Sequence, residues 1–269
     1  SNTTGCYNVA AGAFAMCKNT TGHRNTGLGY AGLTANTTAS YNTAVGFWAL
    51  AANTTSSGNT AVGNEALKSF TKGSANTAVG NRALKLGTTG AQNTAIGTYS
   101  LYMNNGCCQN TASGYYALGT NSTGCHNSAH GMWSLKLNTT GSRNVAVGYK
   151  ALFSNTTAGS NTASGTYALE NNTTGSQNTG HGYQALTTTT TGATNTSTGY
   201  QAMQLNTTGA CNTAYGACAL FCNTTGVCNT ATGFKALLCN CTGARNTATG
   251  GFALLTSKTG TGNSAHGFY

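Results

Sequence analysis

Residues 42–58 read N-T-A-V-G-F-W-A-L-A-A-N-T-T-S-S-G, and the same pattern begins again at Asn59. Steps of 17 residues that start at Asn8 land on Asn sixteen times and end at Asn263, and the residue four positions further on is Gly each time. No insertion or deletion shifts this phase. The chain is therefore a 17-residue repeat, N-T-A-x-G-x-x-A-L-x-x-N-T-T-G-x-x, whose positions are numbered from the Asn at position 1.

A strict repeat of this length predicts the fold class. Each turn of a solenoid stacks on the turn before it, so an insertion in one repeat would break the rows of identical side chains. Seventeen residues are too few for a pair of helices, Thr is a good strand residue and Gly marks turns. We expect an all-β chain that forms a β-solenoid of about sixteen coils, either alone or as part of a multi-chain fibre. We also expect one continuous array over residues 1–269, phased on Asn8, Asn25 and Asn42 through Asn263, with no linker and no capping unit.

Position 9 is apolar in every complete repeat, so we expect it to form the core. Positions 3 and 8 are mostly Ala, which predicts that two walls of the coil lie close together. The predicted core row contains Leu33, Leu50, Leu67, Leu84, Leu101, Leu118, Leu135 and Leu152.

The Asn at position 1 is predicted to point inward. Strand alternation places positions 1, 3 and 5 on one side of the chain and positions 2 and 4 on the other. Position 4 accepts Val, Ser, His and Tyr, which favours an outward direction for it. An inward Asn can pair its amide with the Asn of the neighbouring coils, and Gly at position 5 is expected to supply a positive φ at a corner. The predicted Asn row contains Asn8, Asn25, Asn42, Asn59, Asn76, Asn93, Asn110, Asn127, Asn144 and Asn161.

Large side chains gather at positions 6 and 7. A coil with an Ala-lined interior is too thin to bury them, so we expect a stripe that either stacks along an exposed edge or covers a contact with another chain. The residues predicted to make such lateral contacts are Trp48, Tyr99, Tyr116, Trp133 and Tyr167.

Composition argues against catalysis. Only 5% of the residues are charged, and Glu65 and Glu170 are the only acidic ones. A carboxylate pair, a Ser-His-Asp triad or an Asp-held cation cannot be assembled from this inventory. The twelve basic residues give a net charge of +10 but are scattered over the repeat, whereas nucleic-acid binding needs a dense basic stripe. We therefore predict a protein that is not an enzyme, uses no cofactor or metal, binds no nucleic acid and has no membrane span.

Eleven cysteines are present, and several share a position on neighbouring coils. Parallel strands place such residues about 4.8 Å apart, inside the Cα–Cα range of disulfides, although their Cβ vectors are parallel. Disulfides here would indicate an oxidising, extracellular setting, and the cysteines outside the candidate pairs must be free thiols or form links to another chain. The candidate pairs are Cys108 with Cys125, Cys211 with Cys228, and Cys222 with Cys239.

Two rows carry candidate glycosylation sites. Thirteen Asn-x-Ser/Thr sequons are present, and eleven of them fall at position 12. A glycan on every coil of one row would be crowded, so a buried structural row is favoured over N-glycosylation there. Thr dominates positions 13 and 14, in a turn that should face solvent, where O-linked sugars would help to keep an uncharged surface soluble. The candidate O-glycosylation sites are Thr3, Thr4, Thr20, Thr21, Thr37 and Thr38.

The sequence N-T-A-V-G-x-x-A-L, at Asn42 to Leu50 and at Asn59 to Leu67, together with N-T-T-G, resembles known fibre repeats. These are repeats of phage-type tail fibres and of fibre-like surface proteins of bacteria and of marine algae or their viruses. The pattern is also distantly similar to the head repeats of trimeric autotransporter adhesins, whose shorter coils form a β-roll in a trimer. The resemblance covers the whole chain and implies a repeat fibre.

These features predict a structural protein of an extracellular fibre or filament, at a cell or virion surface, with an adhesive role. Its expected partners are other copies of itself, end to end or side by side, and covalent glycans. Two alternatives stay open. The outward Thr row at position 2 is suited to ice binding, although His130, His181 and Tyr215 at position 4 interrupt a flat surface. Exposed Tyr and Trp side chains are suited to stacking on sugars, as in a carbohydrate-binding tail-fibre module.

Overall fold

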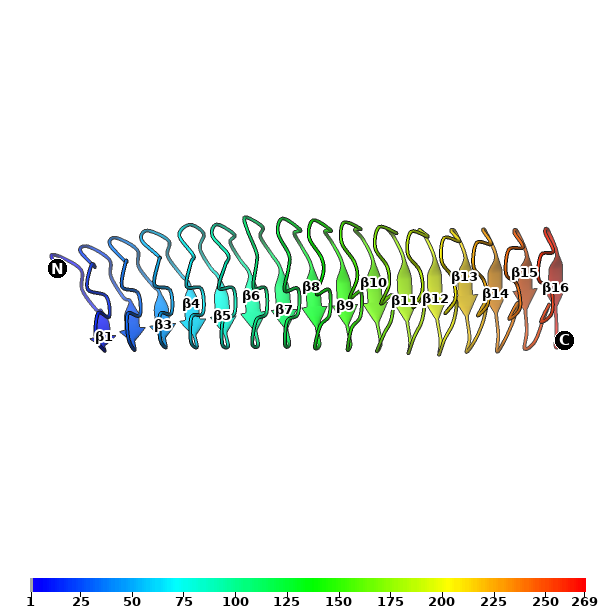
Figure 1. Ribbon diagram of the computed structural model, residues 1–269, viewed down its shortest axis with the longest axis horizontal. Helices are drawn as coiled ribbons and strands as arrows, with labels where there is room; N and C mark the ends of the chain where they lie inside the picture. The colour runs from blue at the N-terminus through cyan, green and yellow to red at the C-terminus, as the bar shows by residue number, and fades with distance from the viewer. Residues whose placement is uncertain (1) are drawn as a thin grey trace. The chain divides into compact units, whose positions relative to one another are not determined.

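A computed structural model describes residues 2–269, and these residues form an all-β β-solenoid with turns of 17 residues and no helix. The predicted fold class is confirmed. The chain divides into two compact units. The first comprises the residues up to Trp133 together with Asn138–Thr140, and the second comprises Ser134–Leu137 and Gly141–Tyr269. Within each unit, successive coils lie side by side (Figure 1).

The first unit contains eight strands of three residues, each at positions 2–4 of its coil. They pair in parallel and in sequence order, and each residue faces the residue 17 positions further on, as Val9 faces Thr26. The strands are β1 (Val9–Ala11), β2 (Thr26–Leu28), β3 (Thr43–Val45), β4 (Thr60–Val62), β5 (Thr77–Val79), β6 (Thr94–Ile96), β7 (Thr111–Ser113) and β8 (Ser128–His130).

The second unit repeats this arrangement with eight more strands in parallel register, so that Thr162 faces Val145 and Thr179. The strands are β9 (Val145–Val147), β10 (Thr162–Ser164), β11 (Thr179–His181), β12 (Thr196–Thr198), β13 (Thr213–Tyr215), β14 (Thr230–Thr232), β15 (Thr247–Thr249) and β16 (Ser264–His266).

The interior of each coil is narrow and is filled by a few small side chains. In β4 the middle residue Ala61 has no exposed surface, whereas Thr60 and Val62 on either side are half-buried. The Ala at position 8 is buried as well, as at Ala66. The predicted Leu row at position 9 is confirmed, because every predicted member from Leu33 to Leu152 is fully buried.

The Asn row at position 1 satisfies polar groups inside the coil. Asn42 donates its backbone N–H to Oδ1 of Asn25 at 2.9 Å, and its own Nδ2 donates to the carbonyl of Ser56 at 3.0 Å. The same bonds recur from coil to coil, for example from Asn59 to Asn42. The predicted inward row is confirmed by burial from Asn25 to Asn161, and Asn8 in the first coil is half-buried.

The Asn at position 12 forms a second buried row, as favoured from the sequence. Asn36 donates Nδ2 to Oδ1 of Asn19 at 2.8 Å and to the carbonyl of Ala39 at 3.1 Å. Asn25 of the first row donates to the same Ala39 carbonyl at 2.8 Å. The two Asn rows therefore meet at the carbonyl of position 15 and tie the two ends of the coil together.

The row at position 12 is interrupted where another residue replaces Asn. Phe70, Thr189 and Ser257 offer no amide to the preceding coil, and Oδ1 of Asn53, Asn172 and Asn240 is in each case buried without a hydrogen-bond partner in the described structure. Phe70 is fully buried, and the next coil has Gly87 at this position, where an added Cβ would lie 3.5 Å from the Phe70 ring. The Phe70 ring thus occupies space that the missing Gly87 side chain leaves.

Gly at position 5 has the predicted positive φ. At Gly46 φ is 134°, and an added Cβ would lie 2.7 Å from the carbonyl carbon of Gly63 on the next coil. A side chain is therefore excluded at this corner both by conformation and by space.

Three further positions per coil are left-handed although they rarely carry Gly, which the sequence did not indicate. Position 7 (Trp48, φ 53°), position 9 (Leu50, φ 50°) and position 17 (Arg24, φ 54°) show this conformation throughout. The reason lies in the direction of the backbone donors. Trp48 donates its N–H to the coil before it at 3.0 Å, whereas Leu50 donates to the coil after it at 3.0 Å. Because left-handed residues alternate with right-handed ones in this turn, its backbone N–H groups can donate to both the preceding and the following coil.

Candidate interaction surface

Aromatic side chains at positions 6 and 7 form two adjacent rows, here called row 6 and row 7. In the first unit the row 6 rings of Tyr30 and Phe47 stack with centroids 5.3 Å apart, and they are 44% and 45% exposed. Trp48 of row 7 stacks on Phe47 at 5.0 Å and is half-buried. Row 6 is therefore the outer row and row 7 the inner one.

The second unit has the same two rows. Tyr183 and Tyr200 of row 6 stack at 5.5 Å and are 42% and 53% exposed. Tyr167 of row 7 packs edge-on against Tyr149 at 5.3 Å and against Tyr183 at 6.1 Å. Neighbouring coils thus hold one another's rings in place while leaving much of row 6 open.

The residues predicted to make lateral contacts all lie in row 7 and are half-buried. Because position 7 has a left-handed backbone and position 6 does not, the two side chains leave the coil in different directions. Aromatic side chains occur at both positions in the sequence, so the sequence does not indicate that row 6 is more exposed than row 7. A contact with another chain stays a prediction. The residues concerned are Trp48, Tyr99, Tyr116, Trp133 and Tyr167.

An ion cluster interrupts the aromatic rows of the first unit. Glu65 at position 7 is 8% exposed and binds Lys68 through Oε1 at 2.7 Å. Its Oε2 binds Nε of Arg82 at 2.9 Å and Nζ of Lys85 at 2.8 Å. The hydrogen bonds from Lys68 and Lys85 lower the pKa of Glu65 to about 2, against the opposing effect of burial. The cluster brings three cations to one carboxylate.

Aromatic rings flank this cluster on both sides. Nζ of Lys68 lies 3.6 Å from the centre of the Trp48 ring, a cation–π contact. Arg82 donates from Nη1 to the Tyr99 hydroxyl at 2.6 Å, and Tyr99 stacks on Tyr116 at 4.6 Å. The cluster was not predicted from the sequence, in which the basic residues are scattered over several positions of the repeat. Their alternation between positions 7 and 10 on consecutive coils was the available signal.

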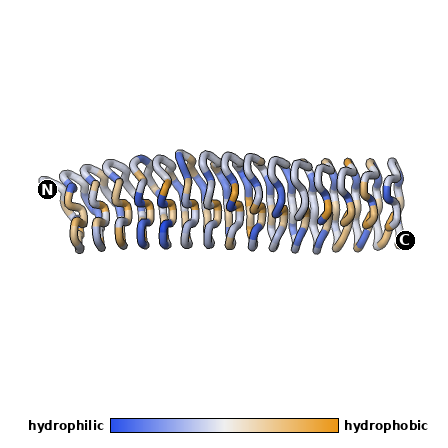
Figure 2. Tube along the Cα trace, viewed as in Figure 1, coloured by the Kyte–Doolittle hydropathy of each residue, from blue (hydrophilic) through white to orange (hydrophobic). Residues whose placement is uncertain are grey.

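An open groove of about 550 Å³ lies beside the cluster. Figure 2 shows that the turns after β1, β2 and β3 are hydrophobic, whereas those after β4 and β5 are hydrophilic. The groove therefore has an apolar part and ends at a charged one. Its lining residues include Phe14, Tyr30, Thr34, Trp48 and Lys68.

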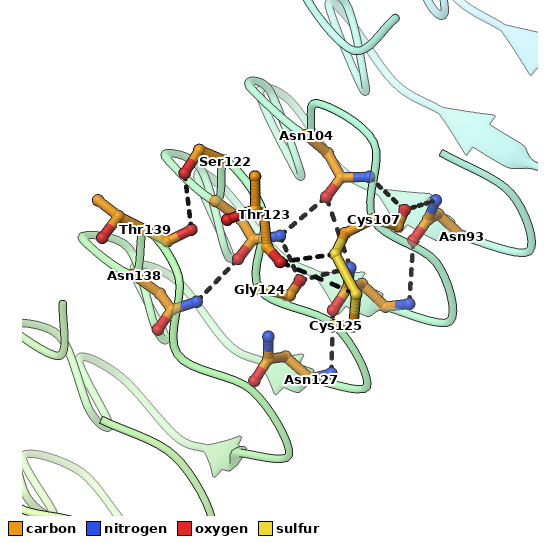
Figure 3. The surroundings of a disulfide bond; sticks show 12 residues. Asn93, Asn104, Cys107, Ser122, Thr123, Gly124, Cys125, Asn127, Asn138 and Thr139 are labelled. Atoms are coloured by element: carbon orange, nitrogen blue, oxygen red, sulfur yellow. Dashed lines mark hydrogen bonds between the residues drawn. A yellow bond between two sulfur atoms is a disulfide. The ribbon is translucent and has the colours of Figure 1, made fainter. Parts of the chain in front are cut away.

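The structure contains a disulfide between Cys107 and Cys125, with Cα atoms 5.3 Å apart (Figure 3). The predicted pairing of Cys108 with Cys125 is wrong in its first partner, and Cys108 is a free thiol. Cys108 and Cys125 share position 16, so their Cβ vectors are parallel. Cys107 lies one position earlier, at position 15, and follows Gly106, whose φ is 93°. Its side chain points into the space between the two coils, where Sγ lies 2.7 Å from the Thr123 carbonyl.

The other two predicted disulfides are also absent from the described residues. Cys211 and Cys228 are exposed thiols that share position 17, and Cys222 and Cys239 are half-buried thiols that share position 11. Parallel Cβ vectors at a shared position account for both results. Burial raises the pKa of the Cys222 thiol, and the nearby Cys239 and Cys241 raise it further.

The Thr turn at positions 13 and 14 divides into two kinds of hydroxyl. The carbonyl of Thr37 accepts the N–H groups of Thr20 and Thr21 at 2.9 and 3.2 Å and also the Thr20 hydroxyl at 3.0 Å. The position 13 hydroxyls of Thr3, Thr20 and Thr37 are used in this way, whereas Thr4, Thr21 and Thr38 at position 14 are exposed. O-glycosylation of these residues stays a prediction.

Among residues 2–269, no group of three or more His, Cys, Asp or Glu side chains is arranged to hold a metal ion. The part of the chain that the structure describes also contains no helix with the length and hydropathy needed to cross a membrane. Compared with known proteins, the chain matches no protein family and no curated protein sequence.

Proposed function

We propose that this protein is a structural component of an extracellular fibre, at a cell or virion surface, with an adhesive role. The observation that carries the proposal is the outer aromatic row. Row 6 rings stack on their neighbours in the same chain, as Tyr183 does on Tyr200, yet these two residues are 42% and 53% exposed. A preformed apolar row of this kind loses little side-chain entropy when a second surface covers it.

The coil itself supports a mechanical role. Its backbone donors bond to the coils on both sides, and its two Asn rows join the ends of each turn. A disulfide fits an oxidising compartment outside the cell, which supports the proposed location. The resemblance of the repeat to tail-fibre and surface-fibre repeats points in the same direction.

Electron micrographs of the purified chain, together with sedimentation velocity over a range of concentrations, test the proposal. We expect filaments or laterally associated particles. Substitution of Tyr183 and Tyr200 by Ser should abolish this association while leaving the circular dichroism unchanged. Substitution of Val145 and Val147 by Thr, which removes exposed apolar groups from β9, serves as the matched control. A monodisperse monomer at high concentration, or equal loss in the control, would rule out the proposal.

Ice binding is a second candidate function, favoured by one face of the first unit. From β2 to β6, position 2 is Thr and position 4 is Leu, Val or Ile on every strand, and all of these side chains are at least partly exposed. Hydroxyl and methyl groups at regular spacing suit an ordered water layer. A thermal hysteresis measurement decides the matter, because an ice-binding chain must show a gap between freezing and melting points.

A further inference from the structure

We propose that the groove and the Glu65 cluster of the first unit together bind an anionic polysaccharide whose sugars carry carboxylates, that is, a polyuronate. The site lies on one unit of one chain and would operate in a monomer or in a fibre. It therefore does not depend on the proposed fibre function. The proposal rests on the charge of the cluster, the exposure of its donors and the aromatic floor beside it.

The cluster has an excess of positive charge that its own carboxylate does not neutralise. Lys68, Arg82 and Lys85 surround Glu65, so the cluster carries a net charge of about +2. Glu65 is also the only acidic residue in the sequence before Glu170. No other carboxylate in the first unit competes for these cations, which leaves them available to an anion from solution.

The cations remain accessible and retain unused donors. The side chains of Arg82 and Lys68 are 41% and 25% exposed. Arg82 uses Nε for Glu65 and Nη1 for Tyr99, and a guanidinium has five N–H donors in a fixed fork. Donors therefore remain for a ligand carboxylate, and Arg is the side chain best suited to bind one.

The groove supplies the second half of the site. The C–H faces of a sugar ring are apolar and pack on aromatic faces, which Tyr30 and Trp48 provide in the groove. Its volume of about 550 Å³ is within the usual range for small-molecule sites. Lys68 belongs to both parts, because it lines the groove and binds Glu65. A sugar on the rings thus places its carboxylate next to the cations.

The same features argue against a nucleic acid. Binding to a phosphate backbone needs many cations in a continuous track. In the first unit the cluster is flanked by neutral rings, Trp48 on one side and Tyr99 with Tyr116 on the other. A short charged segment between aromatic surfaces fits a polymer that alternates ring faces with single carboxylates.

Tryptophan fluorescence can locate the ligand, because the chain has two Trp residues. In a Trp133→Phe variant, Trp48 is the only indole. We expect an oligogalacturonate to change the emission of this variant, and the same oligosaccharide with its carboxyls reduced to alcohols to bind at least tenfold more weakly. In the converse Trp48→Phe variant, the emission of Trp133 should not change. Raising the salt concentration should weaken binding of the charged ligand.

Two charge variants at the same repeat position separate the site from general attraction to a basic protein. Arg82→Gln should weaken oligogalacturonate binding about tenfold, as expected for loss of one charged hydrogen-bond pair. Lys235→Gln, at position 7 in the second unit and 5.0 Å from the Phe234 ring, should bind like wild type. Circular dichroism and the melting temperature confirm folding of each variant.

Several results would overturn the proposal. They are an absent Trp48 response, equal affinity for the carboxyl-reduced oligosaccharide, or equal weakening by Lys235→Gln. Tighter binding of a single-stranded oligodeoxynucleotide of the same charge would do so as well, and would identify a nucleic-acid site instead.

Discussion

Each Asn at position 12 depends on the Asn of the coils before and after it. Asn223 donates Nδ2 to Asn206 at 2.8 Å and accepts from Asn240 at 3.1 Å, so its amide is satisfied only inside an unbroken row. Where the next residue in the row is not Asn, the carbonyl oxygen is buried and unpartnered, as at Asn172. A buried acceptor without a partner costs about 1–3 kcal/mol.

Thr189 offers a direct test of this cost. It is fully buried at position 12, and its hydroxyl oxygen accepts a long hydrogen bond of 3.4 Å from Nδ2 of Asn206. Thr189→Asn should supply the missing donor to Asn172 and raise the free energy of unfolding by about 1 kcal/mol. Thr189→Val keeps the shape but removes the hydroxyl and should lower it. Urea denaturation measures both, and a loss of stability in the Asn variant would contradict the account of the row.

Glu65 predicts a specific loss of stability in acid. Hydrogen bonds from Lys68 and Lys85 lower its pKa from 4.5 to about 2. A carboxylate whose pKa is lowered by folding stabilises the fold above its unfolded pKa, and this contribution is lost as the pH falls from about 4.5 towards 2. We expect the free energy of unfolding to fall by about 1 kcal/mol over that interval, a value that already includes the reduction by solvent screening.

Denaturation curves at pH 5 and pH 2 for wild type and for Glu65→Gln check this expectation. The Gln variant lacks the titrating group and should lose less stability than wild type between the two values. Parallel losses in the two proteins would show that other groups control the acid response.

The coil is the structural element of this protein, and its geometry decides which cysteines pair. Residues at the same position of neighbouring coils have parallel Cα–Cβ vectors. This arrangement allows amides to hydrogen-bond and rings to stack, but it does not bring two sulfur atoms within bonding distance. Cys107 and Cys125 form a bond because they stand at different positions of adjacent coils. The same rule leaves Cys211 with Cys228, and Cys222 with Cys239, unbonded.

Cys107→Ser should therefore lower the free energy of unfolding by about 3 kcal/mol, the usual effect of opening a loop of this length. Cys108→Ser should change it by less than about 0.5 kcal/mol, since Cys108 is a free thiol. Peptide mapping without reduction, after alkylation of free thiols, provides a second readout. A peptide that links Cys108 to Cys125 would contradict this assignment.

Periodicity predicted the parts of the coil that repeat with one residue type. Burial of Asn at position 1 and of Leu at position 9 followed from strand alternation and from the apolar row. The left-handed residues at positions 7, 9 and 17 did not, because Trp48, Leu50 and Arg24 carry no preference for a positive φ. The Glu65 cluster was missed for a related reason. Glu65 at position 7 binds Lys68 at position 10 of its own coil, and Arg82 and Lys85 at positions 7 and 10 of the next coil. These charges do not recur along one position of the repeat, so periodicity did not predict the cluster, and their places on consecutive coils were the available signal.

At the scale of the whole molecule, burial limits where sugars can be attached. Of the thirteen sequons, Asn2 and Asn171 are the exposed ones, and the others lie in the buried rows at positions 1 and 12. A glycan on a buried Asn would displace the amide that holds two coils together. Along most of the chain, N-glycans therefore cannot be what keeps this weakly charged surface soluble.

Expression in a secretory host that attaches N-glycans should place them on Asn171 and Asn2 only. Glycopeptide mass spectrometry measures the occupancy of each sequon. Asn171→Gln should remove one glycan without loss of stability, whereas Asn172→Gln should destabilise the fold because it breaks the row. Glycans on folded protein at Asn36 or Asn206 would contradict the buried row.

The pairing of Phe70 with Gly87 has a consequence for how such a gene can change. Most coils make equivalent contacts with their neighbours, so a recombination event that adds or removes seventeen codons leaves every row in phase. A crossover between the codons of Phe70 and Gly87 is different. It would set the Phe ring against an Asn, or leave an unfilled space above the Gly, and these two coils are therefore expected to be inherited together.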